Sequence, residues 1–393
     1  MIYPRKLLKP LREQLNTPEI IVLTGMRRTG KTTLYRILFE EVESENKAFL
    51  DIENPVEQKV FEETDYNNIW ANLRAFNISP REKAYLFLDE IQAMPQIVKA
   101  IKYLYDHYDV KFLLTGSSSF YLKNLFPESL AGRKFVFELY PLDFEEFLIF
   151  KGIDKAFYPT FSEQDKNKNP VIYEKVKGLY EEYLVYGGFP QVVVESDLSR
   201  KKLHLDDIFK SYFEKDVRNL ADFRDINAFR DLLLLLMQRV GSKLDITKLA
   251  SEVGVSRDTV YSYLSFLEGT YFVSLVAPFS RSADREVSGT KKVYLCDTGM
   301  LNHFAKIGEG SLFENAVFNN LRKYGRINYY QKRSGAEIDF VVDQRVGIEA
   351  KIRGVAADLK KLRKTSLSLG LEESYVVTKD FNESSGFIPA TEI

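Results

Sequence analysis

Short apolar runs alternate with segments of helical periodicity from Glu19 to about Tyr140. Such alternation is typical of a parallel β-sheet whose faces are covered by helices. We expect five of the runs to form strands: Ile20 to Thr24, Ala48 to Ile52, Ala84 to Asp89, Val110 to Thr115 and Phe135 to Leu139. The pattern therefore predicts an α/β domain in the first third of the chain.

The pattern becomes mostly helical between the fifth run and about residue 235. Asp143 and Glu146 have the spacing of a capping box, which predicts the start of a helix. Two breaks interrupt this stretch: the polar segment 162–170, which we expect to be a surface loop or linker, and the turn sequence 187–190. A helical connector is thus predicted for this part of the chain.

Two short amphipathic helices, separated by a glycine turn and a serine cap, are predicted between residues 245 and 268. The apolar positions with the spacing of one shared core are Ile246, Leu249, Ala250, Val253, Val255, Val260 and Leu264. A DNA-binding helix-turn-helix inserts the start of its second helix into the major groove. Here that start carries Arg257, Thr259, Tyr261 and Ser262. Because winged helices also dock proteins, both kinds of partner stay open.

The composition is that of a globular protein, with 45% hydrophobic and 28% charged residues among 393. This length exceeds what one core comfortably supports, so two or three domains are expected. The apolar runs are too short for a bilayer span and the N-terminus lacks an apolar signal segment, so we expect a cytoplasmic protein without a membrane partner. The single cysteine, Cys296, excludes an intramolecular disulfide and a multi-cysteine zinc cluster within one chain.

Positive charge is concentrated in residues 322–364, which hold twelve Lys and Arg against five Asp and Glu in a chain of net charge −1. Such asymmetry between regions points to a polyanionic partner for the basic part. A solvated basic surface produces the same composition, and charge alone does not separate these two interpretations.

Residues Gly25 to Thr33 fit the pattern G-x-x-x-x-G-K-[ST], directly after the first expected strand and before an expected helix. The glycines of such a loop let backbone N–H groups curl around phosphates, and the helix N-terminus adds partial positive charge. We expect Lys31 to bridge the β- and γ-phosphates and Thr32 to offer its hydroxyl to Mg²⁺. The predicted cofactor-binding residues are Gly25, Arg28, Thr29, Gly30, Lys31, Thr32 and Thr33.

The third expected strand ends in Asp89 followed by Glu90, at the edge where ligands bind in such sheets. We expect Asp89 to hold Mg²⁺ through water, and Glu90 to orient or deprotonate the attacking water. A guanine-specificity motif of the N-K-x-D type is absent from the sequence. ATP is therefore the expected nucleotide.

Two further polar residues are candidates for the same site. Ser117 follows the strand 110–115 and could contact the γ-phosphate or the water as a sensor, although serines after a glycine also form ordinary turns. Arg133 could stabilise transition-state charge, either in cis or from a neighbouring subunit. A plain surface arginine is the alternative for Arg133.

Beyond about residue 308, mixed helix and strand patterns carry a second group of acids. Glu314 lies on an expected helix, Asp339 on one strand of an expected hairpin, and Glu349 and Lys351 on its partner. Strand side chains alternate with period two, so Glu349 and Lys351 must point the same way, and we expect Asp339 to join them. Asp339 and Glu349 could hold Mg²⁺ beside a phosphodiester, with Lys351 orienting water. Cross-strand ion pairs are the alternative.

Taken together, the motifs resemble a large group of prokaryotic AAA-type ATPases that pair the ATPase with a conserved C-terminal region containing a restriction-endonuclease-like core. The segments that carry the resemblance are Gly25 to Thr33, Phe87 to Gln92, Leu114 to Ser119, Ser129 to Arg133, Leu139 to Phe147, Gly187 to Pro190, Leu295 to Gly299, Phe313 to Asn315, Glu337 to Asp339 and Ile348 to Lys351. The resemblance implies an ATP site at Lys31, Thr32, Asp89 and Glu90, and a nuclease-like site at Glu314, Asp339, Glu349 and Lys351. Ala350 stands where a β-branched residue is usual.

The expected fold is α/β, in four segments: a P-loop ATPase core with a parallel sheet (1–141), a helical connector (142–235), a winged helix (236–285) and a nuclease-like α/β domain (286–393). The leading functional hypothesis is an ATP-hydrolysing, DNA-associated enzyme with a metal-dependent nuclease-like domain. The alternative is a regulatory switch ATPase that signals to a protein partner without cleavage, and a transcription regulator ranks third. A homo-oligomer is a further expected partner arrangement.

Overall fold

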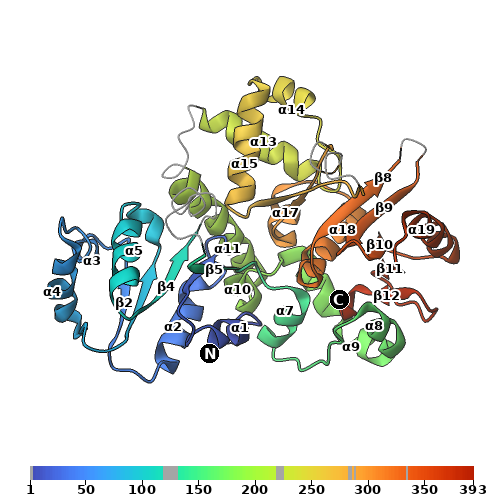
Figure 1. Cartoon of the computed structure of the whole chain (residues 1–393). Coiled ribbons are helices and arrows are strands. Elements are labelled where there is room, and N and C mark those ends of the chain that lie inside the picture. Colours follow the sequence, from blue (N-terminus) through green and yellow to red (C-terminus); the bar gives the residue numbers. More distant parts are fainter. Residues whose placement is uncertain (1–2, 118–131, 218–224, 282–285, 287–288, 333–334) are drawn as a thin grey trace. The chain divides into compact units, whose positions relative to one another are not determined.

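The structure is a computed structural model that describes residues 3–117, 132–217, 225–281, 286, 289–332 and 335–393 (Figure 1). Contacts group the chain into two compact units. The first unit comprises Met1–Tyr140, Ser211–Ala221 and Gly269–Tyr271, and the second comprises Pro141–Lys210, Asp222–Glu268 and Phe272–Ile393. Parts of the expected connector and of the expected winged helix, Ser211–Ala221 and Gly269–Tyr271, thus group with the first unit.

A five-stranded parallel sheet forms the centre of the first unit, in the order β2-β3-β4-β1-β5. Its strands are β1 (Ile20–Thr24), β2 (Lys47–Asp51), β3 (Ala84–Asp89), β4 (Val110–Gly116) and β5 (Lys134–Glu138). All five predicted strands are confirmed to within one residue at each end. Every residue of β1 and β4 is buried, as expected for central strands of a parallel sheet that is covered on both faces.

Helices cover both faces of this sheet because successive strand residues point to opposite sides. Ile21 and Leu23 of β1 pack with α1 (Leu8–Glu13) and α2 (Lys31–Glu41), whereas Ile20 and Val22 pack with α4 (Ile69–Leu73) and α5 (Ile97–His107). A short helix, α3 (Pro55–Gln58), follows β2. This three-layer arrangement brings the carboxyl ends of β1, β3 and β4 to one edge of the sheet.

The second unit begins with helices, as predicted for the connector. They are α7 (Phe144–Phe150), α8 (Phe161–Asn167), α9 (Pro170–Tyr186), α10 (Pro190–Val194) and α11 (Leu198–Ser211). The Asp143 side chain caps α7 by accepting from the backbone N–H of Glu146. The predicted turn at 187–190 separates α9 from α10, and a Cβ at Gly188 would lie 2.1 Å from the carbonyl oxygen of Leu142. Close backbone approach therefore explains the glycine.

The prediction that 162–170 is a loop is wrong, because most of it forms α8. Thr160 and Glu163 make a reciprocal capping box at the start of this helix. Gln164 is fully buried and donates to the carbonyl of Tyr158 and to the hydroxyl of Tyr324, at 2.8 and 2.7 Å. The polar residues in and next to this segment thus include a helix cap and a buried amide. These contacts favour a helix although the composition is typical of a loop.

The two short helices predicted between 245 and 268 are present as α14 (Ile246–Val253) and α15 (Arg257–Gly269), preceded by α13 (Ile226–Gln238). Asp245 caps α14, Gly254 ends it in the left-handed conformation with φ of 76°, and Ser256 accepts from the N–H of Thr259. An antiparallel pair follows, β6 (Val273–Val276) and β7 (Lys292–Leu295), with an isolated bridge between Lys243 and Lys292.

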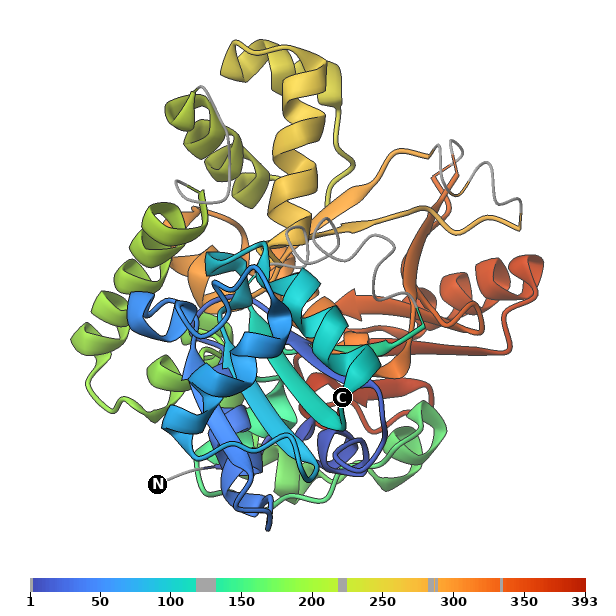
Figure 2. The ribbon, with the colours of Figure 1, turned by 60° about the vertical axis from the view of Figure 1, so that its left-hand side comes forward.

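The C-terminal part of the second unit holds another five-stranded sheet, in the order β12-β11-β10-β9-β8. Its elements are α17 (Thr298–Phe304), α18 (Glu309–Leu321), β8 (Ile327–Gln331), β9 (Glu337–Val342), β10 (Val346–Lys351), α19 (Ala356–Leu369), β11 (Glu373–Thr378) and β12 (Phe387–Pro389). Strands β8, β9 and β10 are antiparallel, whereas β10, β11 and β12 are parallel. The crossover helix α19 packs on this sheet through Leu359 and Leu362 (Figure 2).

Among the described residues, none of the helices combines the length and the apolar character that crossing a bilayer requires.

We predict that Thr160→Ala destabilises α8 by about 1 kcal/mol, because it removes the side chain that accepts from the N–H of Glu163. Hydrogen exchange of the amides of residues 161–167 should become measurably faster. Thr160→Ser keeps the acceptor and is the control that should exchange like the wild type. Unchanged exchange in Thr160→Ala would contradict the capping argument.

Candidate functional site

The loop between β1 and α2 has a shape that depends on two glycines. Gly25 has φ of 149°, and a Cβ there would lie 2.1 Å from the carbonyl oxygen of Leu139. Gly30 is left-handed, with φ of 99°, and forms the N-cap of α2. The Thr29 hydroxyl donates to the Met26 carbonyl at 2.8 Å. The loop is therefore held in a curl, open towards the start of α2, by its own backbone and side chains.

Lys31 lies inside this curl. Its side chain is almost fully buried, and Nζ donates to the carbonyls of Gly25 and Met26 at 2.8 and 3.1 Å. Burial lowers the pKa of the Lys31 ammonium, while the carboxylates of Glu90 and Asp216 act to raise it. A buried ammonium at a helix N-terminus is suited to an anionic ligand such as a phosphate. Lys31 thus occupies the position that the sequence assigns to it.

Thr32 and Asp89 lie side by side at the carboxyl edge of the sheet. The Thr32 hydroxyl donates to Asp89 Oδ2 at 2.7 Å, and the Thr115 hydroxyl donates to the other carboxylate oxygen. Burial raises the pKa of Asp89, and these two hydroxyl contacts oppose the rise. A hydroxyl and a carboxylate are hard oxygen donors, which Mg²⁺ prefers. The donor set therefore fits the magnesium ion of a nucleotide.

Glu90 has a left-handed backbone, with φ of 54°, which is uncommon for a residue other than glycine. Its N–H donates to the Thr115 hydroxyl at 2.9 Å, and its carboxylate accepts from the Gln92 amide. Strained backbone of this kind is found at functional sites, where the surroundings hold it in place. The strain turns Glu90 out of the strand direction, and its carboxylate lies 3.8 Å from Arg27 of the phosphate loop.

Ser117 has two polar partners. Its hydroxyl donates to Asp216 Oδ1 at 2.8 Å and accepts from the Gln92 amide at 3.2 Å. Arg27 Nε lies 3.1 Å from the same Asp216 oxygen. The structure thus brings Ser117 to the phosphate loop, whereas Ser118 and Ser119 of the same cluster lie outside the described residues.

Four residues of this site were missed by sequence reasoning: Arg27, Gln92, Thr115 and Asp216. Arg27, Gln92 and Thr115 lie within or beside the motifs, so they could have been named as candidate site residues from the sequence. Asp216 lies in a π-helix, Tyr212–Val217, more than 90 residues beyond the last motif of the site along the chain. Its local sequence carries no pattern that links it to a phosphate loop.

Arg133 lies away from the phosphate loop of its own chain, and its role, which the sequence left open between action in cis and action from a neighbouring subunit, stays a prediction. Its carbonyl accepts from the N–H of Ile20, at the amino end of β1, whereas the loop follows the carboxyl end at Thr24. Four residue steps along a strand separate these ends by about 13 Å. Its guanidinium lies 3.2 Å from the carboxylate of Asp106 on α5. Part of its motif, 129–131, lies outside the described residues.

Two of the predicted loop residues contribute backbone rather than buried side chains. The side chains of Arg28 and Thr33 are exposed, and Arg28 adopts a left-handed φ of 66°.

In the second unit, the register of β9 and β10 pairs Phe340 with Ile348. One step further along the ladder, Asp339 lies opposite Glu349, so the two carboxylates share a face of the hairpin. Asp339 Oδ2 accepts from the N–H of Ala350 at 2.9 Å, and the Lys351 ammonium lies 2.9 Å from Glu349 Oε1. The expected convergence of Asp339, Glu349 and Lys351 is therefore present.

Glu314 approaches the same carboxylates from α18. It accepts from the Tyr294 hydroxyl at 2.7 Å, and the buried ammonium of Lys292 lies 3.9 Å from it and 2.9 Å from Glu337. Burial raises the pKa of Glu314, and the neighbouring Asp339 carboxylate raises it further. Burial likewise raises the pKa values of Asp339 and Glu349. The acids thus crowd one another, with Asp339 between the other two.

Two observations bear on whether these acids could hold a metal ion: the arrangement of their side chains and the hydrogen bonding of their oxygens. Among the residues that the structure describes, no three His, Cys, Asp or Glu side chains have the arrangement of a metal site. Glu349 Oε2, however, is buried without a hydrogen-bond partner in the described part of the chain. Burying a carboxylate oxygen without a partner costs free energy unless a cation or a hydrogen-bond donor binds it. The unpartnered oxygen of Glu349, opposite Asp339 on the hairpin, is therefore a donor that a cation or a hydrogen-bond donor could complete.

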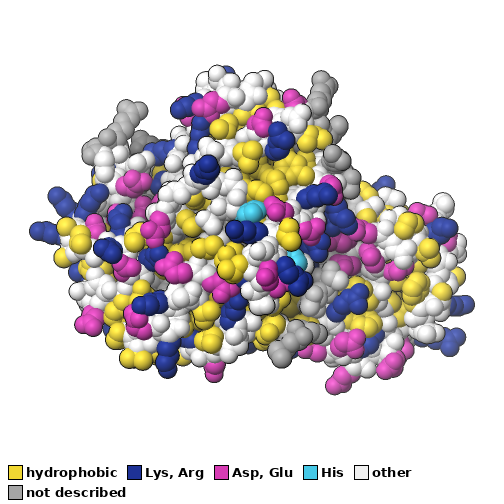
Figure 3. All heavy atoms as spheres, turned by 180° about the vertical axis from the view of Figure 1, so that it is seen from behind, with side chains coloured by type: hydrophobic (Ala, Val, Ile, Leu, Met, Phe, Trp, Pro, Cys, Tyr) yellow, Lys and Arg dark blue, Asp and Glu magenta, His cyan; other side chains and the backbone are white. Residues whose placement is uncertain are grey.

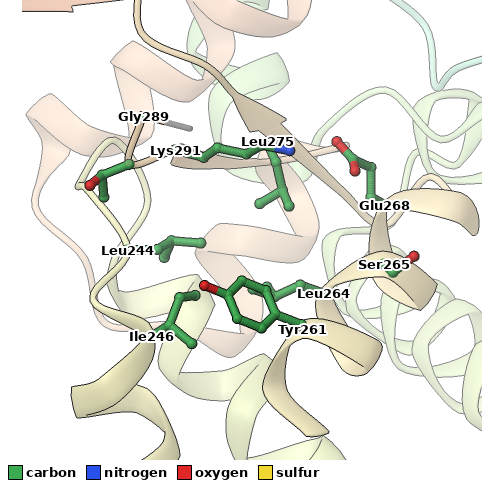
Figure 4. Close-up of a pocket in the computed structure, with 10 residues that line it drawn as sticks. Leu244, Ile246, Tyr261, Leu264, Ser265, Glu268, Leu275, Gly289 and Lys291 are labelled. Atoms are coloured by element: carbon green, nitrogen blue, oxygen red, sulfur yellow. The ribbon is translucent and has the colours of Figure 1, made fainter. Parts of the chain in front are cut away.

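The surface of α15 is only partly free for a nucleic acid. Arg257, Tyr261 and Ser262 are exposed, whereas Thr259 is half-buried. The ring of Tyr261 also lines a cavity of about 510 Å³ that is bordered by Leu244 and Leu275 (Figure 4). Three of the four predicted contact residues thus reach the surface.

Much of the basic region forms ion pairs. These pairs are Lys323 with Glu145, Arg326 with Glu286, Lys351 with Glu349, Arg345 with Glu372 and Arg353 with Asp380. On the face shown in Figure 3, Lys and Arg side chains lie among Asp and Glu. Helix α19 carries a run of exposed basic side chains, Lys360, Lys361, Arg363 and Lys364. Five of the twelve basic residues thus lie in ion pairs, whereas the basic run on α19 is exposed.

Comparison with known proteins agrees with the geometry of the first unit. Residues 17–148 match the model of a family described as an AAA domain. This match supports a P-loop ATPase fold for this part of the chain. Residues 177–311 and 309–389 match two further families, each described as a domain of unknown function (DUF8612 and DUF4143).

Several relatives match this chain over most of its length. A Haemophilus influenzae protein is 28% identical over 354 residues, covering 87% of this chain and 84% of its own. A Methanocaldococcus jannaschii protein is 29% identical over 338 residues, covering 82% and 72%. Both are described as uncharacterized proteins. Among solved structures, the Aeropyrum pernix ORC1 protein in complex with DNA covers 80% of this chain and 93% of its own at 14% identity, with a TM-score of 0.34, from which nothing follows about function.

We predict that Lys31→Ala raises the Kd for ATP with Mg²⁺ by at least about 100-fold, because it removes the buried ammonium that the loop holds for phosphates. Isothermal titration calorimetry of the full chain measures this. Arg36→Ala removes a positive charge from the exposed face of the same helix, where the guanidinium stacks on Phe49, and should bind as the wild type does. Wild-type affinity in Lys31→Ala would contradict the phosphate-loop assignment.

Proposed function

We propose that this protein hydrolyses ATP and that its nucleotide state controls a DNA-associated second unit with a metal-dependent nuclease-like site. The observation that carries the ATPase part is the contact of Thr32 with Asp89, next to a strained Glu90 and a curled phosphate loop. These groups come from two segments that lie far apart in the chain, and each has the chemistry that its position requires.

The proposed role of each residue follows from the functional group of its side chain. Bound Mg²⁺ would neutralise phosphate charge and orient the leaving group. Thr32 and Asp89 hold it, and Lys31 exchanges its contacts with the loop carbonyls for contacts with the phosphates. The Glu90 carboxylate accepts the proton of the attacking water or orients it. Ser117, at the end of β4, donates to the γ-phosphate or to the water. Arg133 would stabilise transition-state charge, and its distance from the loop of its own chain favours action from a neighbouring subunit.

We assign the segment from α13 to β7 to a winged helix. Support comes from the order of three helices followed by an antiparallel pair of strands, and from the isolated bridge between Lys243 and Lys292. Arg257 and Ser262, at the exposed start of α15, would face DNA bases or phosphates, and the basic run on α19 would add phosphate contacts. A protein partner on the same helix remains the competing assignment.

We assign the C-terminal sheet to a nuclease-like domain. Support comes from the paired positions of Asp339 and Glu349, from Lys351 on the face of Glu349, and from the unpartnered Glu349 oxygen. In this assignment the two carboxylates hold Mg²⁺, Lys351 orients water or stabilises charge on the phosphate, and Glu314 lies at the edge of the metal site. The alternative is a switch ATPase in which these acids only bind, and the cleavage assay below separates the two.

We predict that Glu90→Gln leaves ATP binding intact but slows hydrolysis by roughly two or more orders of magnitude, the usual scale for losing a general base. Single-turnover hydrolysis and nucleotide titration of the full chain measure the two quantities separately. Glu62→Gln removes an exposed carboxylate from the same unit and should turn over normally. Normal turnover in Glu90→Gln would move the role to another residue.

We predict that Asp339→Asn lowers Mn²⁺ affinity and abolishes plasmid cleavage while ATP hydrolysis stays within about twofold of wild type, since Asp339 and the phosphate loop belong to different units. Cleavage is measured with Mg²⁺ or Mn²⁺, with and without ATP. Asp343→Asn, at an exposed left-handed position that asparagine tolerates, is the matched control. A wild-type chain that hydrolyses ATP but cuts no plasmid under any of these conditions would favour the switch alternative.

A further inference from the structure

The π-helix Tyr212–Val217 folds with the phosphate loop rather than with the helices that precede it in the chain. It belongs to the first unit, although α11, which leads into it, lies in the second unit up to Lys210. The buried Tyr212 hydroxyl lies 2.8 Å from that of Thr270, another residue that joins the first unit from a distant part of the chain. A π-helical turn is rare and is often found at functional sites. The grouping of this π-helix with the phosphate loop therefore indicates a functional role for the turn.

Asp216 is the residue that this turn delivers. Its side chain is only 2% exposed, and one carboxylate oxygen takes both the Ser117 hydroxyl at 2.8 Å and Arg27 Nε at 3.1 Å. Ser117 ends β4, and Arg27 lies inside the phosphate loop. A hydroxyl and a guanidinium at these two places are the donors that a γ-phosphate requires, because charged donors make the strongest bonds to phosphate oxygens.

The cations that the structure describes beside Asp216, Arg27 and Lys31, already interact with carboxylates. The Arg27 guanidinium already faces three carboxylates, those of Asp216, Glu53 and Glu90. Lys31 interacts with Asp216 and Glu90 as well. Burial raises the pKa of Asp216, with Arg27, Ser117 and Lys31 opposing the rise, so its carboxylate depends on these donors. A phosphate that takes the same donors would destabilise the Asp216 carboxylate in its buried position.

We propose that Asp216 competes with the γ-phosphate of ATP for Arg27 and Ser117, and that ATP, unlike ADP, expels it. This inference rests on the proposed function, since it concerns the regulation of the same site. ADP leaves the two donors to Asp216, and the π-helix stays in place. ATP takes the donors, and Asp216 leaves with the turn that carries it.

The covalent path of the chain gives this exchange a consequence. Residues 212–217 continue directly from α11, whose first thirteen residues belong to the second unit. Displacement of the π-helix therefore acts on the end of a helix of that unit. The presence of the γ-phosphate would thus be communicated through one continuous segment, without a relay of side chains.

The test is nucleotide affinity in the full-length chain. Asp216→Asn keeps the shape of the side chain and removes its charge, so the Kd for a non-hydrolysable ATP analogue should fall by about tenfold while the Kd for ADP stays within about twofold. Glu53→Gln is the matched control, because it also removes a carboxylate partner of Arg27 but does not contact Ser117. Its effect on the two nucleotides should be equal.

Hydrogen exchange supplies a second readout. In the wild type, peptides covering residues 211–217 should exchange faster with the ATP analogue than with ADP, and in Asp216→Asn they should exchange fast with both. Weaker binding of the analogue to Asp216→Asn, or an equal change for both nucleotides, overturns the inference and leaves ATP binding standing. A wild-type chain that binds neither nucleotide overturns the proposed function, and this inference with it.

Discussion

The parallel register of β1, β3 and β4 is the constraint on which the first unit depends. Thr24 pairs with Gly116, and Leu88 pairs with Leu114, so the three strands end together. The phosphate loop, the Asp89 carboxylate and the Thr115 hydroxyl therefore meet at one edge, although many residues separate them along the chain. The hydrogen bonds between Thr32, Asp89 and Thr115 follow from this register. A shift of β3 by one residue would turn Asp89 to the opposite face of the sheet.

An antiparallel register has the same importance in the second unit. Because Phe340 pairs with Ile348, Asp339 and Glu349 must lie next to each other, and the alternation of strand side chains brings Lys351 to the same face. The ends of the hairpin are fixed further by α19, which packs across β9, β10 and β11 through Leu359 and Leu362. Both groups of acids are thus positioned by strand pairing, which is more rigid than a loop.

Sequence reasoning recovered the elements whose information is local. The five parallel strands, α14, α15, the phosphate loop and the Asp339–Glu349 hairpin all have patterns that span only a few residues. It failed where contacts between residues that are distant in the sequence determine the local structure or the position of a side chain. The polar segment 162–170 became a helix because Thr160 caps it and Gln164 is buried against Tyr324. Arg133 was separated from the loop by strand direction, and Asp216 reaches it only through the folding of a distant π-helix. Neither fact can be found from residue spacing.

The balance of buried charge distinguishes the two acidic groups from the rest of the core. Some buried ions elsewhere are matched one to one, as for Lys155 with Glu392 at 2.7 Å, and such a pair fixes a single arrangement. Around Arg27, and around Asp339, carboxylates lie close together and compete for the same cations. Burial of this kind costs free energy that a structural role alone does not require. A phosphate with its Mg²⁺ at the first group, and a cation at the second, would each offset part of that cost, so ligand binding and local stability are coupled at both places.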